Sequence, residues 1–227
     1  MEARENGAGG TWAAAMRLPV EGVEEWGDLV GAYRNVSARL AASHPPRDLM
    51  RSLTATLEHV ADQLEPHEVG EAERFAGRAP SLPARGHLFL IPVEVTETTQ
   101  ASMRARVTLS DLHLGGAAAA HGGTQPLLFD ELLGMLVMRA HPVMLRTASL
   151  TVNYRKITPV GVELEVEASI DRIDGRKVWA SGRLRRGDEE LVDAVGLFIL
   201  LRPESTDGRL AFGVPEIDEH VRKRAPD

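Results

Sequence analysis

Residues 123–139 read GTQPLLFDELLGMLVMR, a run in which most positions are apolar. A helix on a protein surface keeps one polar face, but here leucine, methionine and valine recur on every side. We therefore predict a helix over roughly residues 123–139 that is enclosed by other elements. Pro126 suits its first turn, where the backbone N–H groups have no partner within the helix.

The segments on both sides of this helix alternate with the period of two that is typical of strands. Residues 103–109 alternate apolar and polar side chains, and the dipeptides at 174–175 (DG) and 187–188 (GD) favour hairpin turns. The strands expected after the helix lie at residues 146–156, 162–171, 178–184 and 191–201. Two strands, a buried helix and four antiparallel strands predict an α+β domain whose sheet wraps the helix.

Helical periodicity precedes this domain. Apolar residues recur at steps of three and four from Trp26 to Leu40 and again from Leu49 to Leu64, which predicts an amphipathic helical hairpin. Prolines, glycines and charges then accumulate, as is typical of a linker. The expected organisation is a flexible tail at 1–18, a helical hairpin at 19–65, a linker at 66–85, the α+β domain at 86–202 and a polar tail at 203–227.

Composition excludes several classes of function. The 227 residues carry a formal net charge of −7, with 26 basic and 33 acidic side chains, so no excess positive field attracts nucleic acid. The absence of cysteine rules out thiolate nucleophiles and cysteine-ligated metals. Acidic Glu2 and Glu5 do not suit a signal peptide, and no apolar run reaches the length of about 18 to 20 residues that spans a membrane. We expect a cytoplasmic protein.

Asp130 and Glu131 are the only formally charged residues between Leu112 and Met138. A carboxylate within an enclosed apolar helix costs several kcal/mol unless it is hydrogen-bonded or paired. Asp130 is therefore either a buried structural hydrogen-bonding group or a functional one. Glu131 lies about 100° away around the helix and is expected to be structural.

The surrounding residues form a motif. HGG at 121–123 is followed by six residues and Asp130, then by TASLTVNY at 147–154 and DGR at 174–176. This combination resembles the PaaI-like and THEM-type acyl-CoA thioesterases over about half of the chain. The resemblance implies a hotdog fold, in which an antiparallel sheet wraps a central helix. It also implies hydrolysis of a fatty or aryl acyl-CoA, or of an acyl carrier, without a cofactor other than the coenzyme A of the substrate.

The resemblance further assigns roles to individual residues in a site that is assembled across the interface of a homodimer or homotetramer. Asp130 matches the catalytic carboxylate, either a general base or a nucleophile, and the backbone N–H of Gly122 matches the group that polarises the thioester carbonyl. Glycines at the start of a helix do offer unpaired N–H groups at the positive end of its dipole. Thr147 matches the residue that positions water, although it could also be an ordinary strand threonine. His121 is implied to shape the loop rather than to act as the base.

Further residues are candidates for substrate binding. Alternation predicts one polar strand face that carries Thr147, Ser149, Thr151 and Asn153. The basic side chains at 155–156 and 176–177 could contact the phosphates of coenzyme A or form a solvated rim. The complete set of predicted substrate-binding residues is Gly123, Asn153, Arg155, Lys156 and Arg176.

Other functions remain as alternatives. THEM-type enzymes often have asparagine where this chain has Gly115, six residues before His121, so a non-catalytic hotdog protein that binds acyl-CoA or acyl carrier protein is the second hypothesis. A dehydratase is disfavoured because no separate pair of histidine and acidic residue is evident. The histidines are not spaced as metal ligands, and phosphate-binding and serine-nucleophile motifs are lacking.

Overall fold

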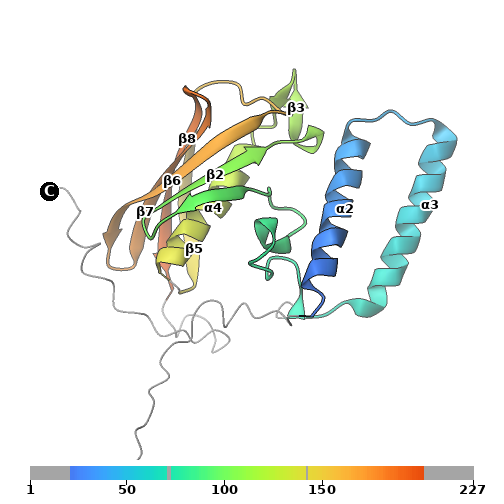
Figure 1. The fold of residues 1–227 in the computed structure, drawn as a ribbon, viewed down its shortest axis with the longest axis horizontal. Helices are drawn as coiled ribbons and strands as arrows, with labels where there is room; N and C mark the ends of the chain where they lie inside the picture. The colour runs from blue at the N-terminus through green and yellow to red at the C-terminus, as the bar shows by residue number, and fades with distance from the viewer. Residues whose placement is uncertain (1–20, 71–72, 142, 202–227) are drawn as a thin grey trace, which may run out of the picture. The chain divides into compact units, whose positions relative to one another are not determined.

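The computed structural model describes residues 21–70, 73–141 and 143–201, which divide into two compact units. One unit contains the sheet and the central helix, and the other contains the N-terminal helices (Figure 1). The expected tails at 1–18 and 203–227 lie outside the described residues.

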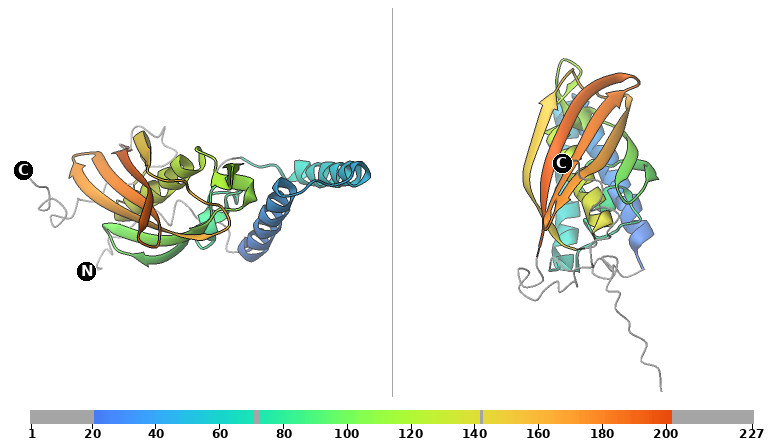
Figure 2. Two further views of the ribbon diagram at one scale, coloured as in Figure 1. Left: turned by 90° about the horizontal axis from the view of Figure 1, so that it is seen from above. Right: turned by 90° about the vertical axis from the view of Figure 1, so that its left-hand side faces the viewer.

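The sheet unit confirms the predicted hotdog arrangement. Six antiparallel strands follow one another in the order β1-β2-β6-β7-β8-β5, and helix α4, Thr124–Ala140, packs against β5 to β8 inside the curve of the sheet (Figures 1 and 2). The strands are β1 Glu94–Thr98, β2 Ser102–Thr108, β5 Leu145–Tyr154, β6 Glu163–Asp174, β7 Lys177–Arg186 and β8 Glu189–Leu200.

Two glycines make the predicted hairpin turns possible. Gly175 between β6 and β7 has φ 56°, and Gly187 between β7 and β8 has φ 57°. Glycine adopts this left-handed backbone conformation without the steric cost that a Cβ atom adds. Strands β6, β7 and β8 are therefore neighbours in sequence order, and β8 also pairs with β5 on its other side.

The core forms between α4 and the inner face of the sheet. Phe129, Leu133 and Leu136 of the helix are fully buried together with Phe198 of β8. A Cβ atom on Gly182 would lie 2.8 Å from the ring of Phe129, so the absence of a side chain there lets the ring press onto β7. Close packing of this kind fixes the rotation of α4 about its axis and so determines which residues it presents to the site.

The N-terminal unit contains the two predicted helices. Helix α2 spans Val23–Ala41 and helix α3 spans Arg47–Leu64, and the two are joined by residues 42–46 (Figure 1). A short 3₁₀ turn, η1 at Glu65–His67, follows α3. None of the helices in the described part of the chain is long and apolar enough to cross a bilayer.

The segment expected to be a linker includes residues that pack within this unit. Trp26 of α2 stacks on Phe75 with the ring centroids 5.4 Å apart, and its Nε1 donates to the carbonyl oxygen of Gly86 at 2.9 Å. Arg34 donates to the carbonyl oxygen of His87 at 2.8 Å, and Ala79 is fully buried. The prolines and glycines in this segment shape a folded turn, η3 at Pro83–Gly86, that covers one side of α2.

Candidate active site

The loop before α4 is held by backbone hydrogen bonds. A two-stranded hairpin, β3 Leu114–Gly116 and β4 Ala119–Ala120, leads into it. The His121 N–H donates to the carbonyl oxygen of His113 at 2.7 Å, and the Ala120 N–H donates to that of Thr158 at 2.8 Å. These bonds anchor the HGG segment from both sides just before the helix begins.

His121 caps the start of the helix. Its Nδ1 accepts the N–H of Gly123 at 3.0 Å, and its carbonyl oxygen accepts the N–H of Thr124 at 2.9 Å. Because Nδ1 is an acceptor here, a neutral His121 carries its proton on Nε2. The N–H of Gly123, a predicted substrate-binding residue, is thereby used within the loop.

Two residues that the sequence analysis missed orient the peptide group of Gly122. The hydroxyl of Tyr154 donates to the carbonyl oxygen of Gly122 at 2.5 Å. The buried amide of Gln125, oriented to satisfy its neighbours, donates to the carbonyl oxygens of His121 at 2.9 Å and Gly122 at 3.3 Å, and accepts from Thr158 Oγ1 at 3.1 Å. The one sequence signal for Gln125 was an amide side chain at the start of an otherwise apolar helix.

The N–H of Gly122 is left available. Among the described residues it has no hydrogen-bond acceptor, while the carbonyl oxygen of the same residue has two donors. Gly122 is exposed, and a Cβ atom there would approach only the Tyr154 hydroxyl, at 3.9 Å. A free, oriented N–H at the positive end of a helix can stabilise negative charge that develops on a substrate oxygen.

Asp130 is hydrogen-bonded but not enclosed. Its Oδ1 accepts from Thr147 Oγ1 at 2.8 Å, and both residues are exposed. The expectation that Asp130 sits in an enclosed apolar environment is therefore wrong for a single chain. The cause is that the sheet covers only part of α4, so the side of the helix that carries Asp130 is left open. The second carboxylate oxygen, Oδ2, has no donor among the described residues and can accept a proton or contact a water molecule.

A β-bulge gives Thr147 its direction. In the pairing of β5 with β8, Thr147 is opposite Phe198 but Ser149 is opposite Leu197, so Ala148 is an extra residue. Phe198 is buried against α4, and Thr147 takes the same side of the sheet, whereas Ser149 lies on the other. The prediction that Thr147 shares a face with Ser149, Thr151 and Asn153 is wrong because a bulge reverses the alternation.

Within one chain, the pair Gly122 and Tyr154 lies apart from the pair Asp130 and Thr147. Asp130 lies seven positions after Gly123, the residue that precedes α4, which corresponds to about 10 Å of helix at about 1.5 Å per residue, and Gly122 lies one residue further from Asp130. A hydrogen bond to a carbonyl oxygen and an attack on its carbon both act over about 3 Å. One chain therefore brings Asp130 to Thr147, and Gly122 to Tyr154, but does not bring the two pairs to one thioester.

The predicted basic contacts have carboxylate partners in the same chain. Asn153 donates to Asp193 at 2.7 Å, and Arg155 also donates to Asp193. The hydrogen bond from Arg155, followed by that from Asn153, lowers the pKa of Asp193, and the same bond raises the pKa of Arg155. Lys156 forms an ion pair with Glu189 at 2.6 Å and, with Arg186, lowers the pKa of Glu189.

Arg176 lies at the opposite end of β5 from Arg155 and Lys156. It donates to the carbonyl oxygen of Leu200 at 3.2 Å, and Leu200 pairs with Leu145, the first residue of β5. Arg155 and Lys156 directly follow the last residue of this strand. Within one chain these basic residues are therefore not a single phosphate site.

Gly115 has a steric reason to be glycine. A Cβ atom at this position would lie 2.7 Å from Cα of His121 and 3.0 Å from its backbone nitrogen. The asparagine that the resemblance suggests here does not fit the backbone as it stands. The loop is therefore built without that side chain.

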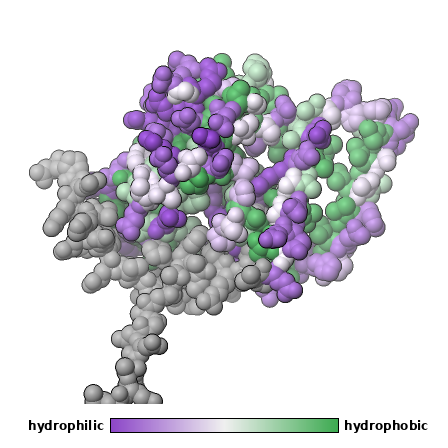
Figure 3. All heavy atoms as spheres, in the orientation of Figure 1, coloured by the Kyte–Doolittle hydropathy of each residue, from purple (hydrophilic) through white to green (hydrophobic). Residues whose placement is uncertain are grey.

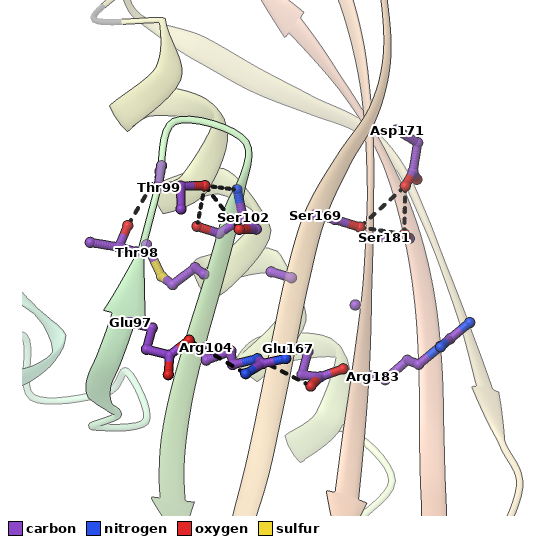
Figure 4. A pocket seen from close by; sticks show the side chains of 13 residues that line it. Glu97, Thr98, Thr99, Ser102, Arg104, Glu167, Ser169, Asp171, Ser181 and Arg183 are labelled. Atoms are coloured by element: carbon purple, nitrogen blue, oxygen red, sulfur yellow. Dashed lines mark hydrogen bonds and ion pairs between the residues drawn. The ribbon is translucent and has the colours of Figure 1, made fainter. Parts of the chain in front are cut away.

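A polar hollow of about 520 Å³ lies elsewhere on the sheet, between strands β1, β2, β6 and β7 (Figure 4). Its polar side chains bind one another: Arg104 contacts Glu97 and Glu167, and Ser181 donates to Asp171 at 2.8 Å. Such a self-paired, solvated surface has no group oriented for chemistry. It contains none of the predicted site residues.

Part of the chain is similar to known proteins. Residues 117–192 match the model of the thioesterase superfamily. Acyl-coenzyme A thioesterase THEM4 of Bos taurus is 32% identical over 88 residues, which are 38% of this chain and 35% of that protein. THEM4 of Xenopus laevis is 34% identical over 92 residues, which are 39% of this chain and 40% of that protein. The match thus spans about two fifths of the length of these relatives.

One solved structure is similar over more of the chain. A crystal structure of a thioesterase superfamily protein, RHA08564, has a TM-score of 0.63 and 28% identity, and the alignment covers 81% of this chain and 97% of that one. The residues that match the thioesterase superfamily model, 117–192, include the wrapped helix α4 and the strands β5, β6 and β7 of the sheet. The sheet unit thus has the hotdog fold, and residues 117–192 within it are similar to the thioesterase superfamily.

Proposed function

We propose that a homodimer of this chain hydrolyses the thioester of a fatty or aryl acyl-CoA, or of an acyl carrier, to the free acid and the thiol. The observation that carries the proposal is a pair of oriented groups, one on α4 and one in the loop just before it. Asp130 is a carboxylate fixed by Thr147, and Gly122 offers a free N–H whose peptide group is fixed by Tyr154 and Gln125.

The dimer would bring these groups together. Strand β5 is the last strand of the sheet and has a free edge that can pair with another strand. If two copies of β5 pair antiparallel with Thr151 opposite its own counterpart, the extra residue Ala148 brings Thr147 of one copy opposite Tyr154 of the other. Asp130 of one copy then approaches Gly122 of the second, and the separation of the two groups within one chain no longer matters.

The chemistry follows from the two groups. The Gly122 N–H donates to the thioester oxygen and stabilises the negative charge that develops there. Asp130 of the other copy either removes a proton from water as the water oxygen attacks the carbonyl carbon or attacks that carbon itself. The carbon–sulfur bond breaks, and the thiolate leaves and takes up a proton. If water attacks, its oxygen becomes part of the acid directly. If Asp130 attacks, water then hydrolyses the anhydride between Asp130 and the acyl group, which releases the acid and restores the carboxylate. Thr147 holds the carboxylate in place, and no cofactor takes part.

The basic residues are proposed to hold coenzyme A. Arg155 and Lys156 follow Tyr154, the last residue of β5. In the same two-fold pairing, the last residues of β5 in one copy lie beside the first residues of β5 in the other, which are near Arg176 of that other copy. Arg155 and Lys156 bind carboxylates in the free chain, so phosphate would have to compete with Asp193 and Glu189. Asn153 supports this arrangement by binding Asp193, and Gly123 by positioning His121.

Thiol release from short, medium, long and aryl acyl-CoAs tests the function. We expect turnover of one substrate class and a loss of at least about a hundredfold in Asp130→Asn, because the amide can neither accept the proton nor attack. Glu131→Gln, which changes the neighbouring carboxylate, is the control and should keep most of the activity. If the wild type binds acyl-CoA but releases no thiol, the chain is a binding protein instead.

A further inference from the structure

The N-terminal helices α2 and α3 expose many large apolar side chains. Ten large apolar side chains of α2 and α3 are 36–53% exposed. Apolar residues are visible along these helices in the space-filling view (Figure 3). On α2 they are Leu29, Tyr33, Val36 and Leu40, and on α3 they are Leu49, Met50, Leu53, Leu57, Val60 and Leu64. No residue of α3 is buried. Rows of exposed apolar side chains of this kind mark an interaction site.

The stripe on α3 has the spacing of helices that pack against other helices. Met50, Leu53, Leu57, Val60 and Leu64 follow at alternating steps of three and four, so they repeat every seven residues. The face of α2 that carries Val30 and Trp26 is already covered by the segment around Phe75 and Gly86. The exposed stripe of α2 is a separate face, and it needs its own partner.

The charges of the hairpin are divided between its two ends. The half next to the turn, residues 32–56, contains Arg34, Arg39, Arg47 and Arg51 with Asp48 as its only acidic residue. The other half, residues 21–31 and 57–67, contains seven acidic residues and neither lysine nor arginine. The acidic residues are Glu21, Glu24, Glu25, Asp28, Glu58, Asp62 and Glu65.

We infer that the hairpin docks on the hairpin of a second copy of this chain, in antiparallel orientation, to form a four-helix bundle. In this orientation the basic end of each hairpin meets the acidic end of the other, and both contacts are attractive. In the parallel orientation basic ends would meet each other, and so would acidic ends. The division of charge thus favours a second copy of the hairpin as the partner of the apolar face, and it favours the antiparallel orientation of that copy.

The two-fold symmetry of the antiparallel bundle makes a specific geometric prediction. Each α3 crosses over the α3 of the other copy, and the middle of the apolar stripe, Leu57, meets its own counterpart. Arg51 then comes level with the segment that contains Asp62. Leu64, seven positions from the middle, is about 21 Å from its counterpart, twice the rise of seven residues at about 1.5 Å each.

Single-cysteine variants of the full chain test this geometry, because the natural sequence contains no cysteine. Leu57→Cys should form a disulfide-linked dimer after mild oxidation, seen on a non-reducing denaturing gel. Leu64→Cys should remain mostly monomeric on that gel, since a disulfide needs Cα atoms within about 7 Å. Both side chains are about half exposed, so neither substitution disturbs a buried core.

A second substitution tests whether the apolar stripe is the interface. Adding Leu53→Glu to the Leu57→Cys variant should slow cross-linking at least tenfold. Adding Ala55→Glu instead, on the opposite side of α3, is the control and should leave the rate within about twofold. Circular dichroism checks that both variants keep their helix content. The inference is overturned if Leu57→Cys does not cross-link, if Leu64→Cys cross-links equally fast, or if the two glutamate variants behave alike. Those outcomes would leave the face to another segment of the same chain or to a different protein.

Discussion

The hydroxyl of Thr147 donates to Oδ1 of Asp130 at 2.8 Å and joins residues that are 17 positions apart in the sequence. The bond connects β5 to α4 at the point where α4 is open to solvent. A carboxylate held by one oxygen keeps its other oxygen free in a defined direction. This relationship turns an exposed acidic residue into a candidate catalytic group.

Thr147→Val should lower kcat of the proposed thioesterase by about 10- to 100-fold, because a hydrogen bond to a charged group contributes about 1.5–3 kcal/mol. Thr147→Ser keeps the hydroxyl and is the matched control. Steady-state thiol release measures both. Equal activity in the valine and serine variants would show that Thr147 is an ordinary strand residue.

Tyr154→Phe should reduce kcat/KM by about tenfold, because the Gly122 peptide loses one of the two donors that orient it. Tyr154 is 53% exposed, so the midpoint of urea unfolding should change little. Activity and unfolding are measured on the same preparation. A large loss of stability with unchanged activity would contradict the positioning role.

Gln125→Leu should destabilise the fold by about 1–3 kcal/mol, because the hydroxyl of buried Thr158 loses its acceptor and the carbonyl oxygens of His121 and Gly122 each lose one of two donors. Thr158→Val removes only the hydroxyl that contacts Gln125 and should cost less. Urea unfolding of both single variants and of the double variant gives their coupling energy. Strictly additive effects would show that Gln125 and Thr158 do not form one network.

His141→Gln should make stability less dependent on pH. Burial lowers the pKa of His141 below its ordinary value near 6.5. As the pH falls through that value, the unfolded chain takes up a proton that the folded chain still refuses, so folded stability is lost below it and retained above it.

The slope that one such histidine contributes is at most about 1.4 kcal/mol per pH unit. Urea midpoints of the wild type and His141→Gln, measured between about pH 7 and pH 5, give the comparison. Parallel pH profiles would show that other groups cause the dependence.

Much of the fold follows from local patterns in the sequence. The apolar run at 123–139 requires a helix that something covers, and alternation beside it requires strands. DG at 174–175 and GD at 187–188 mark turns that only glycine adopts easily. The candidate site is partly local as well, since HGG immediately before a helix offers N–H groups at a known place.

Other features depend on contacts between distant segments. The bulge at Ala148 appears only when β5 pairs with β8, and it turns Thr147 toward Asp130, against the alternation of the strand. The ring of His121 determines which glycine keeps a free N–H. It accepts the N–H of Gly123, and the N–H of Gly122 stays free. Likewise, Arg155 finds Asp193 only because the two strands lie side by side.

The sequence by itself determined the elements, their turns and the two candidate groups, one on a helix and one just before it, because periodicity and backbone chemistry act over a few residues. Only the tertiary structure decided which side of α4 stays open, which face Thr147 takes and how the segment around Phe75 packs. These depend on strand register and on close packing, which join residues far apart in the chain and leave no periodic trace in it.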